Sequence, residues 1–229
     1  MAAMAFVPMA APAAGAVVVD SGNTGYSFVM DYAGYVNEAW TDQVSALADF
    51  VFDGVTNNGL TYNFSYTMTN DSIVDSRIRS FGVDTSGTVT SLSATGAYSY
   101  TDQDGQFPVG LGRLDLCFIA TSNGSCTGGP GGLSSNPDET GTGTFAITFS
   151  QVMEAVTFDN FAVRFQSINP TVNGSSSGIG IGALVDGGGS GNPITAPEPG
   201  TWLMMLGGFG LIGHAMRRRM VPARLPRIA

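Results

Sequence analysis

The sequence predicts an all-β protein: a β-sandwich or jelly-roll-like domain followed by a single apolar helix near the C-terminus. Charged residues make up only 12% of the 229 residues, glycine contributes 32 residues, and there is no lysine. This composition is typical of short strands joined by many turns. Apolar and polar residues alternate strictly from Leu60 to Asn70, which is the period of a strand with one buried face. No segment of the body shows convincing helical periodicity.

Short apolar runs separated by turn residues predict about eight to ten strands, as in a sandwich or a jelly roll. Asn57-Asn58-Gly59 is expected to form the turn before the strand of residues 60–70. Ala94-Thr95-Gly96 is expected to join the segments on either side of it as a hairpin. The expected strands are residues 26–32, 44–54, 60–70, 76–84, 87–93, 96–102, 113–120, 143–150, 155–168 and 178–186.

Two of these segments carry a specific packing expectation. Ile78 and Phe81 can both point inward only if a bulge lies between them, because a strand alternates its side chains with a period of two. In residues 155–168, strict alternation places Val156, Phe158 and Asn160 on one face, together with Ala162 and Arg164, and Phe161, Val163 and Phe165 on the other. Both faces are partly apolar, which predicts a central strand.

The net charge of −9 is unevenly distributed along the chain. The body has four arginines against 18 acidic residues, a balance of −14, and the other five arginines all follow Met216. Such a body is repelled by nucleic acid, whose affinity depends on neutralising phosphates. We expect an acidic, well-solvated surface and no nucleic-acid partner.

The histidine content limits the chemistry open to the body. His214 is the only histidine and lies in the apolar C-terminal stretch, so the body cannot place a histidine base beside a serine or cysteine nucleophile. Histidine-ligated metal catalysis is excluded in the same way. A glycosidase or lyase that uses a pair of Asp carboxylates is compatible with this composition. Nothing in the sequence places two such carboxylates across a cleft. We expect no catalytic activity and no cofactor.

Cys117 and Cys126 are the only cysteines and lie nine positions apart. In an exported protein such a pair is typical of one disulfide that closes a glycine-rich loop. Two cysteines are too few for a structural zinc site. Two unpaired buried thiols are the alternative, and the sequence favours the disulfide.

Two further features are candidates for ligand binding. Asp102 and Asp104, followed by a glycine, are similar to the start of a calcium loop, but no late glutamate follows, so a plain turn is favoured. Trp40, Tyr98 and Tyr100 are candidates for glycan binding, because the faces of sugars stack on aromatic rings. The alternative for all three is the core, where most aromatic side chains of a small sandwich lie.

The first 16 residues are apolar and rich in alanine. Ala14-Gly15-Ala16 fits the small-x-small site of a signal peptide, which leaves Val17 as the mature N-terminus. No positive charge precedes the apolar run, and Pro8 and Pro12 interrupt it. We interpret residues 1–16 as a truncated signal peptide, and an apolar arm is the alternative.

The C-terminal end combines three features in order: Pro197-Glu198-Pro199, an apolar stretch and three successive arginines. Thr201 to Met216 is 16 residues without a formal charge, somewhat short for a spanning helix. Arg217, Arg218 and Arg219 follow directly, and positive charge on one flank orients a membrane segment with that flank in the cytoplasm. Trp202 lies at the other edge of the stretch, where aromatic rings prefer the membrane interface.

This ending resembles the PEP-CTERM sorting signal of Gram-negative bacteria, which has a Pro-Glu-Pro, a short apolar helix and an arginine-rich end. Trp202 with Met204 and Met205 is similar to the variant that has Trp-x-Met-Met after the PEP. The resemblance implies transient anchoring in the inner membrane, recognition by an exosortase and cleavage near the PEP. It also implies an association with exopolysaccharide and biofilm. A plain membrane anchor is the alternative.

The body resembles the cistern family of PEP-CTERM proteins in three pieces: "TYNFSYTMTND", "RLDLCFIATSNGSCTGGPGG" and "FDNFAVRFQSI". The resemblance covers most of residues 62–168. That family has no established activity, so it implies a relationship and little mechanism.

The sequence thus predicts an exported, exosortase-processed envelope or extracellular-matrix protein without catalytic activity. Its expected partners are an exosortase and extracellular polysaccharide. A carbohydrate-binding module of the cell surface is the alternative, and an Asp-based glycosidase or lyase is less favoured. The expected segments are a truncated signal peptide (1–16), a β-sandwich domain (17–185), a Gly/Ser-rich spacer (186–195), the sorting signal (196–219) and a tail (220–229).

Overall fold

The structure is a computed structural model that describes residues 15–108, 110–136 and 138–185. Contacts divide the chain into two units, Met1–Ile194 and Thr195–Ala229, and all the described residues belong to the first. The predicted signal peptide up to residue 14, the spacer, the apolar helix and the tail lie outside the described residues.

The described part is all-β, as predicted, with 12 strands and two short 3-10 helices. The strands are β1 (Val17–Asp20), β2 (Ser27–Val36), β3 (Ala39–Thr56), β4 (Thr61–Asn70), β5 (Asp75–Thr85), β6 (Val89–Ala94), β7 (Tyr100–Phe107), β8 (Gly112–Ile119), β9 (Leu133–Ser134), β10 (Thr140–Phe149), β11 (Ala155–Asn169) and β12 (Ser177–Val185). The 3-10 helices are η1 (Asn57–Gly59), at the predicted turn, and η2 (Gly96–Tyr98).

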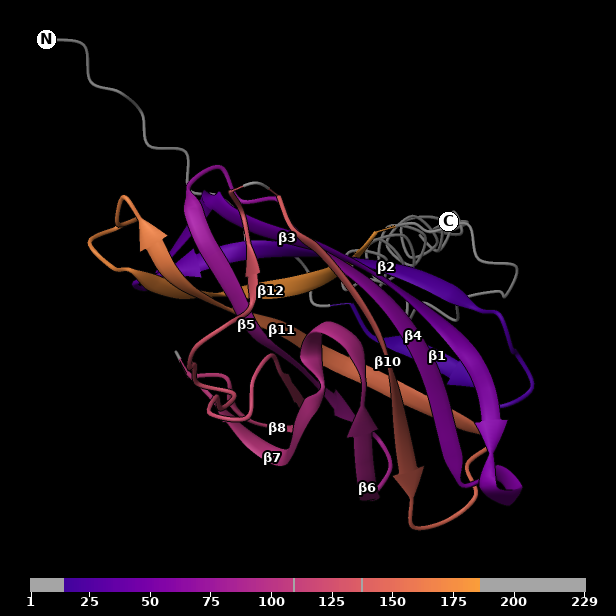
Figure 1. Cartoon of the computed structure of the whole chain (residues 1–229). Coiled ribbons are helices and arrows are strands. Elements are labelled where there is room, and N and C mark those ends of the chain that lie inside the picture. Colours follow the sequence, from indigo (N-terminus) through magenta and orange to yellow (C-terminus); the bar gives the residue numbers. More distant parts are fainter. Residues whose placement is uncertain (1–14, 109, 137, 186–229) are drawn as a thin grey trace, which may run out of the picture. The chain divides into compact units, whose positions relative to one another are not determined.

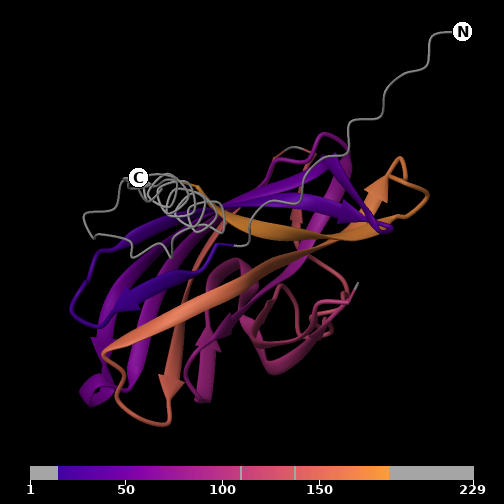
Figure 2. The same cartoon turned by 180° about the vertical axis from the view of Figure 1, so that it is seen from behind.

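All these strands belong to one antiparallel sheet, which curls into a sandwich-like shape (Figures 1 and 2). The strand order is β6-β10-β4-β3-β2-β12-β11-β5-β8-β7, with β1 added to β11 and β9 to β5. β6 and β7, the first and last strands of this order, lie close to each other. The Thr101 hydroxyl in β7 donates a hydrogen bond to the Leu92 carbonyl in β6 over 3.3 Å. The sheet is therefore nearly closed around its core.

The alternation seen in the sequence explains how β4 and its neighbour β10 divide their side chains. Tyr62, Phe64, Tyr66 and Met68 of β4 are all buried, while the Thr, Asn and Ser residues between them face outward. Phe145 of β10 lies directly opposite Phe64, and their rings stack with centroids 4.9 Å apart. One face of each strand therefore builds the core and the other forms an outer surface.

The main core is unusually aromatic. Seven phenylalanines from six strands enclose a cavity of only about 10 Å³: Phe28, Phe50, Phe64, Phe81, Phe145, Phe158 and Phe161. That volume is at most enough for one water molecule. A smaller second cluster on the other side of the sheet contains Phe107, Leu114, Ile119 and Ala162 with both cysteines. The interior is thus filled by side chains and offers no space for a ligand between these rings.

Two bulges decide which residues reach the main core. Ser80 pairs with Arg164 and Ile78 with Phe165, so Arg79 is an extra residue that lets both Ile78 and Phe81 point inward, as predicted. The predicted division of the β11 side chains between two faces is wrong. The strand is nevertheless central, as predicted. Asn160, with a φ of 51°, lies at a second bulge, so Phe161, Val163 and Phe165 join Val156 and Phe158 in the main core.

The predicted hairpin around Ala94-Thr95-Gly96 is also wrong. β6 pairs with β10 and β7 pairs with β8, so the segments on either side of this turn belong to opposite ends of the strand order. Gly96 has a φ of +80°, and an added Cβ there would collide with the Thr142 carbonyl. This close approach lets the chain leave β6 and cross to β7. β1 and the short β9 were not predicted from the sequence.

Candidate functional site

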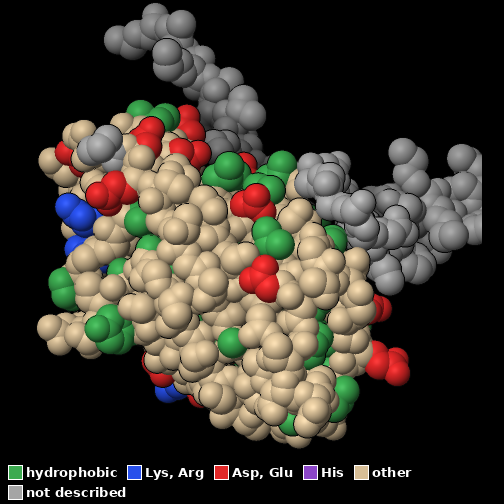
Figure 3. All heavy atoms as spheres, turned by 45° about the vertical axis from the view of Figure 1, so that its right-hand side comes forward, with side chains coloured by type: hydrophobic (Ala, Val, Ile, Leu, Met, Phe, Trp, Pro, Cys, Tyr) green, Lys and Arg blue, Asp and Glu red, His purple; other side chains and the backbone are tan. Residues whose placement is uncertain are grey.

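The outer side of the neighbouring strands β6, β10 and β4 carries small, uncharged polar side chains, and Thr56 at the end of β3 extends it beside the outward Asp49 and Asp53. Along β4 and β10, every outward residue is Thr, Ser or Asn except Ala146. We define the hydroxyl face as Thr56, Thr61, Asn63, Ser65, Thr67, Thr69, Ser91, Ser93, Thr95, Thr140, Thr142, Thr144, Ala146 and Thr148. Figure 3, which brings the side with β4 and β10 forward, shows a broad tan surface with only scattered charged side chains.

The hydroxyl face is a regular array because its strands are in register. Thr142 lies opposite Thr67, and Thr144 lies opposite Ser65. Outward positions recur about every 6.8 Å along a strand, and neighbouring strands are about 4.8 Å apart. Threonine is β-branched, so its χ1 angle is restricted. The hydroxyl groups are therefore held in repeating positions.

Hydrogen bonds between strands order several of these hydroxyl groups further. Three cross-strand pairs of threonine hydroxyls are within hydrogen-bond distance: Thr61 with Thr148 at 3.0 Å, Thr69 with Thr140 at 2.9 Å and Thr95 with Thr144 at 2.8 Å. A hydroxyl that donates to one partner can still accept from another. The array therefore keeps hydrogen-bonding capacity toward a ligand.

Ala146 creates a hollow in this face. It lies between Ser93 of β6 and Asn63 of β4, where a methyl group replaces the longer side chains found at the other outward positions. A hollow of about 300 Å³ is lined there by these residues together with Asp53, Phe64, Ala94, Thr95, Thr144 and Phe145. Asp53 accepts a hydrogen bond from Ser65 over 3.2 Å and is the one carboxylate that lines this hollow.

The hydroxyl face was not predicted from the sequence. Its signal is nevertheless visible in "TGTGTFAITF", residues 140–149, where threonines alternate first with glycine and then with core residues. The pairing of this segment with residues 61–70 and with β6 appears only in the fold. A surface that four strands build together could not be read from one strand.

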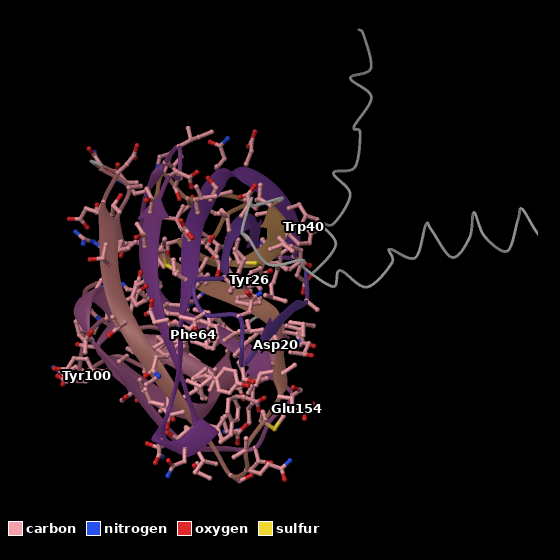
Figure 4. The ribbon with its side chains drawn as sticks, turned by 90° about the vertical axis from the view of Figure 1, so that its right-hand side faces the viewer. Asp20, Tyr26, Trp40, Phe64, Tyr100 and Glu154 are labelled. Carbon is pink, nitrogen blue, oxygen red and sulfur yellow. A yellow bond between two sulfur atoms is a disulfide. The ribbon has the colours of Figure 1, made fainter. Side chains whose placement is uncertain are left out.

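The three aromatic candidates for glycan binding lie in different surroundings. Trp40 is half-buried and packs against Tyr35, with ring centroids 5.0 Å apart and a tilt of 60°. Tyr100 is 46% exposed and lies far from Trp40 (Figure 4). Tyr98 is fully buried, which excludes its ring from contact with a glycan and corrects that prediction. It belongs to η2, and its hydroxyl donates to the Ile78 carbonyl over 3.0 Å.

The acid-x-acid-Gly segment lies in β7 and not in a plain turn. Asp104 has a φ of 57° and pairs with Arg113, with 3.2 Å between Oδ2 and the guanidinium nitrogen. Asp102 approaches the disulfide, and its Oδ2 is 3.8 Å from Cys126 Sγ. Within residues 15–108, 110–136 and 138–185, no three His, Cys, Asp or Glu side chains are grouped so that they could hold a metal ion.

A second open hollow, of about 410 Å³, lies beside the turn between β5 and β6 and includes Asp104 and Asp115. The carboxylates around it support the backbone: Asp115 accepts from the Thr85 amide over 2.9 Å, and Asp84 accepts from the Asp115 amide over 3.0 Å. Asp159 lies nearby. Its partial burial, then repulsion from Asp84 and Asp115, raises the pKa of the Asp159 carboxyl.

Cys117 in β8 and Cys126 form a disulfide, as predicted. It ties the glycine-rich segment after β8 to the sheet. The Arg164 guanidinium, only 8% exposed, lies under this segment and donates from Nε to the Thr127 carbonyl over 2.9 Å. Burial lowers the pKa of Arg164. Gln166 also contacts the segment, since its Oε1 accepts from the Gly129 amide over 3.1 Å.

The predicted sorting residues lie outside the described residues: Pro197, Glu198, Pro199, Trp202, Arg217, Arg218 and Arg219. In the part of the chain that the structure does describe, no helix is long and apolar enough to cross a membrane. The described domain ends with β12 at Val185, ten residues before the second contact unit begins at Thr195.

Comparison with known families finds one motif. A model of the PEP-CTERM protein-sorting motif matches residues 195–219, which confirms the resemblance of the C-terminal end. No curated protein and no solved structure matches the chain. The resemblance of the body to the cistern family stays a prediction.

Proposed function

We propose that this chain, an exported target of exosortase because it carries the PEP-CTERM protein-sorting motif, serves in the cell envelope or the extracellular matrix without catalytic activity. The motif accounts for export and for exosortase processing toward the cell surface. The role of the domain that is delivered is our inference.

The observation that carries this proposal is the position of the folded domain between the predicted signal-peptide cleavage site and the sorting motif. β1 begins at Val17, the predicted mature N-terminus, and its side chain is only 1% exposed. β12 ends at Val185, and the sorting motif starts at residue 195. Removal of both ends therefore leaves every strand of the sheet intact. We infer that removal of the predicted signal peptide and the sorting motif releases a complete folded domain.

A non-catalytic role agrees with how the domain uses its carboxylates. Asp84 and Asp115 accept hydrogen bonds from backbone amides at the β5–β8 junction, and Asp104 pairs with Arg113. These contacts give the three carboxylates a structural role in holding strands together. The aromatic core itself holds no substrate site, because the space of about 10 Å³ between its rings is far below the roughly 300 Å³ and more of small-molecule sites.

The test of the proposal is a two-tag fractionation in the native host. One tag is placed after Gly187 and a second after Arg219. We expect the first tag outside the cell and separated from the second. Both tags together in the inner membrane would contradict exosortase processing and favour a plain anchor. Turnover of a polysaccharide by the released domain, abolished by single Asp→Asn changes, would contradict the non-catalytic role.

A further inference from the structure

We propose that the hydroxyl face is a binding surface for an extended, neutral polysaccharide, with the hollow at Ala146 as its central contact. This inference rests on the proposed function, because only an exported domain meets extracellular polysaccharide. It adds the chemical class of the ligand and the place where it binds.

Charge selects a neutral ligand. The body carries −14 in formal charge, yet the 14 residues of the hydroxyl face include no charged side chain. All four arginines of the body lie in β5, β8 and β11, outside this face. Asp49 and Asp53 border it on β3. An anionic polymer would meet two carboxylates and no cation, so electrostatic complementarity favours an uncharged one.

The regular spacing of hydroxyl groups on this face favours a polymer that carries hydroxyl groups on every unit. Hydroxyl groups and one amide recur on adjacent strands in fixed register, and such groups both donate and accept hydrogen bonds. The cross-strand pairs Thr61–Thr148 and Thr95–Thr144 hold them in place before binding. A preorganised surface loses less conformational entropy when a ligand binds. A polymer with a hydroxyl group on every unit matches such a surface at several points.

The hollow supplies a place where one unit of the polymer can sit below the level of the other side chains. Ala146 lines it between its two cross-strand neighbours, Asn63 and Ser93, which supply an amide and a hydroxyl group. Asp53 lies at the β3 side, where its carboxylate can accept from a sugar hydroxyl. The volume of about 300 Å³ is at the lower end of small-molecule sites.

The test is retention of the purified full chain on insoluble cellulose and on cross-linked dextran, both neutral, and on phosphocellulose, which has the cellulose backbone with anionic groups. We expect retention on at least one neutral matrix, with little change on adding salt, and none on phosphocellulose. The triple change Thr67→Val, Thr142→Val and Thr144→Val is expected to weaken retention at least about tenfold, because each lost hydroxyl removes a hydrogen bond.

Matched variants separate loss of binding from loss of the fold. The changes Thr88→Val, Thr157→Val and Thr171→Val remove the same number of hydroxyls outside the hydroxyl face and are expected to leave retention unchanged. Valine is a good strand former, so both triple variants are expected to keep the fold. Ala146→Tyr fills the hollow from an outward position and is expected to abolish retention. The circular dichroism spectrum of each variant is recorded beside the binding measurement.

Four results would overturn the inference. They are no retention on either neutral matrix, retention that survives the triple change on the face, retention lost in Trp40→Ala, and a wild-type dimer that the same triple change dissociates. The third result would place the glycan on the Trp40 surface, and the fourth would assign the face to a second copy of the chain. Retention is measured on purified protein, so a failure of export would overturn the proposed function and leave this measurement standing.

Discussion

Asn63 and Ala146 lie directly opposite each other in the antiparallel pair of β4 and β10, and both side chains point away from the core. Their chain neighbours Phe64 and Phe145 are also opposite each other, but they stack inside the core with ring centroids 4.9 Å apart. The same register thus fixes the aromatic core on one side of these strands and the hollow on the other. Changes to the outward pair are expected to alter binding while the inward pair maintains the fold.

Two buried tyrosines differ in whether their hydroxyl groups have partners. The Tyr98 hydroxyl donates to the Ile78 carbonyl over 3.0 Å, whereas the Tyr32 hydroxyl has no hydrogen-bond partner among the described residues. We expect Tyr98→Phe to lower the free energy of unfolding by about 1–2 kcal/mol, because a buried acceptor loses its donor. Tyr32→Phe is expected to be neutral or stabilising. Urea unfolding of both variants tests this, and equal losses would contradict the assignment.

The tight turn between β2 and β3 places a glutamate in an unfavourable conformation. Asn37 and Glu38 have φ values of 48° and 64°, and two-residue turns of this kind prefer Asn-Gly. Glu38→Gly is expected to raise the free energy of unfolding by up to about 1 kcal/mol, since glycine adopts positive φ without a steric cost. Ala39→Gly, at the first position of β3, is the control and is expected to destabilise. A loss of stability in Glu38→Gly would contradict this account of the turn.

The disulfide between Cys117 and Cys126 fixes the segment that covers Arg164. The double change Cys117→Ala and Cys126→Ala is expected to lower the free energy of unfolding by about 2–3 kcal/mol, because the unfolded chain is no longer cross-linked. Adding a reductant is expected to destabilise the wild type and to leave the double variant unchanged. Equal sensitivity of both proteins to reductant would show that the disulfide is not the cause.

Stability is expected to depend on pH through Asp159. Its pKa is raised by partial burial and then by Asp84 and Asp115, so the folded state binds its proton more tightly than the unfolded state does. The stability that this group contributes is present below the unfolded pKa of about 3.9 and is lost as pH rises through the folded pKa. Asp159→Asn is therefore expected to be more stable than wild type near pH 7 and equal to it near pH 3.

The measurement is urea unfolding of the wild type and of Asp159→Asn across this pH range. Asp159→Glu keeps the charge and is the control that is expected to retain the pH dependence. A difference between the wild type and Asp159→Asn that stays constant from low to neutral pH would show that ionisation of Asp159 is not responsible.

Local patterns predicted much of the fold. The alternation in residues 60–70 identified β4 and its buried face, and the three-residue spacing of Ile78 and Phe81 required the bulge found at Arg79. The bulge at Asn160 was missed because strict alternation gave no reason for a residue with positive φ there. Asparagine is among the few residues that adopt this conformation readily, so its position in an otherwise apolar run was the available signal.

Pairing between distant segments was the part that the sequence did not predict. A turn-like Ala94-Thr95-Gly96 indicates a reversal of the chain, but β6 pairs with β10, which lies about 50 residues further on. The hydroxyl face depends on that pairing, which is why the site was found only in the structure. Tyr98 was placed wrongly for a local reason: residues 96–98 form η2 and not the start of a strand, and the Tyr98 ring is buried in the core.

The most direct test of the central claim is the intact mass of the protein recovered from the surface or the medium of the native host. The account predicts a species that begins at Val17 and ends near Pro197-Glu198-Pro199, with the apolar stretch and Arg217, Arg218 and Arg219 removed and any group added by the exosortase visible as extra mass. A species that still carries residues 201–229 would contradict release of the domain by exosortase.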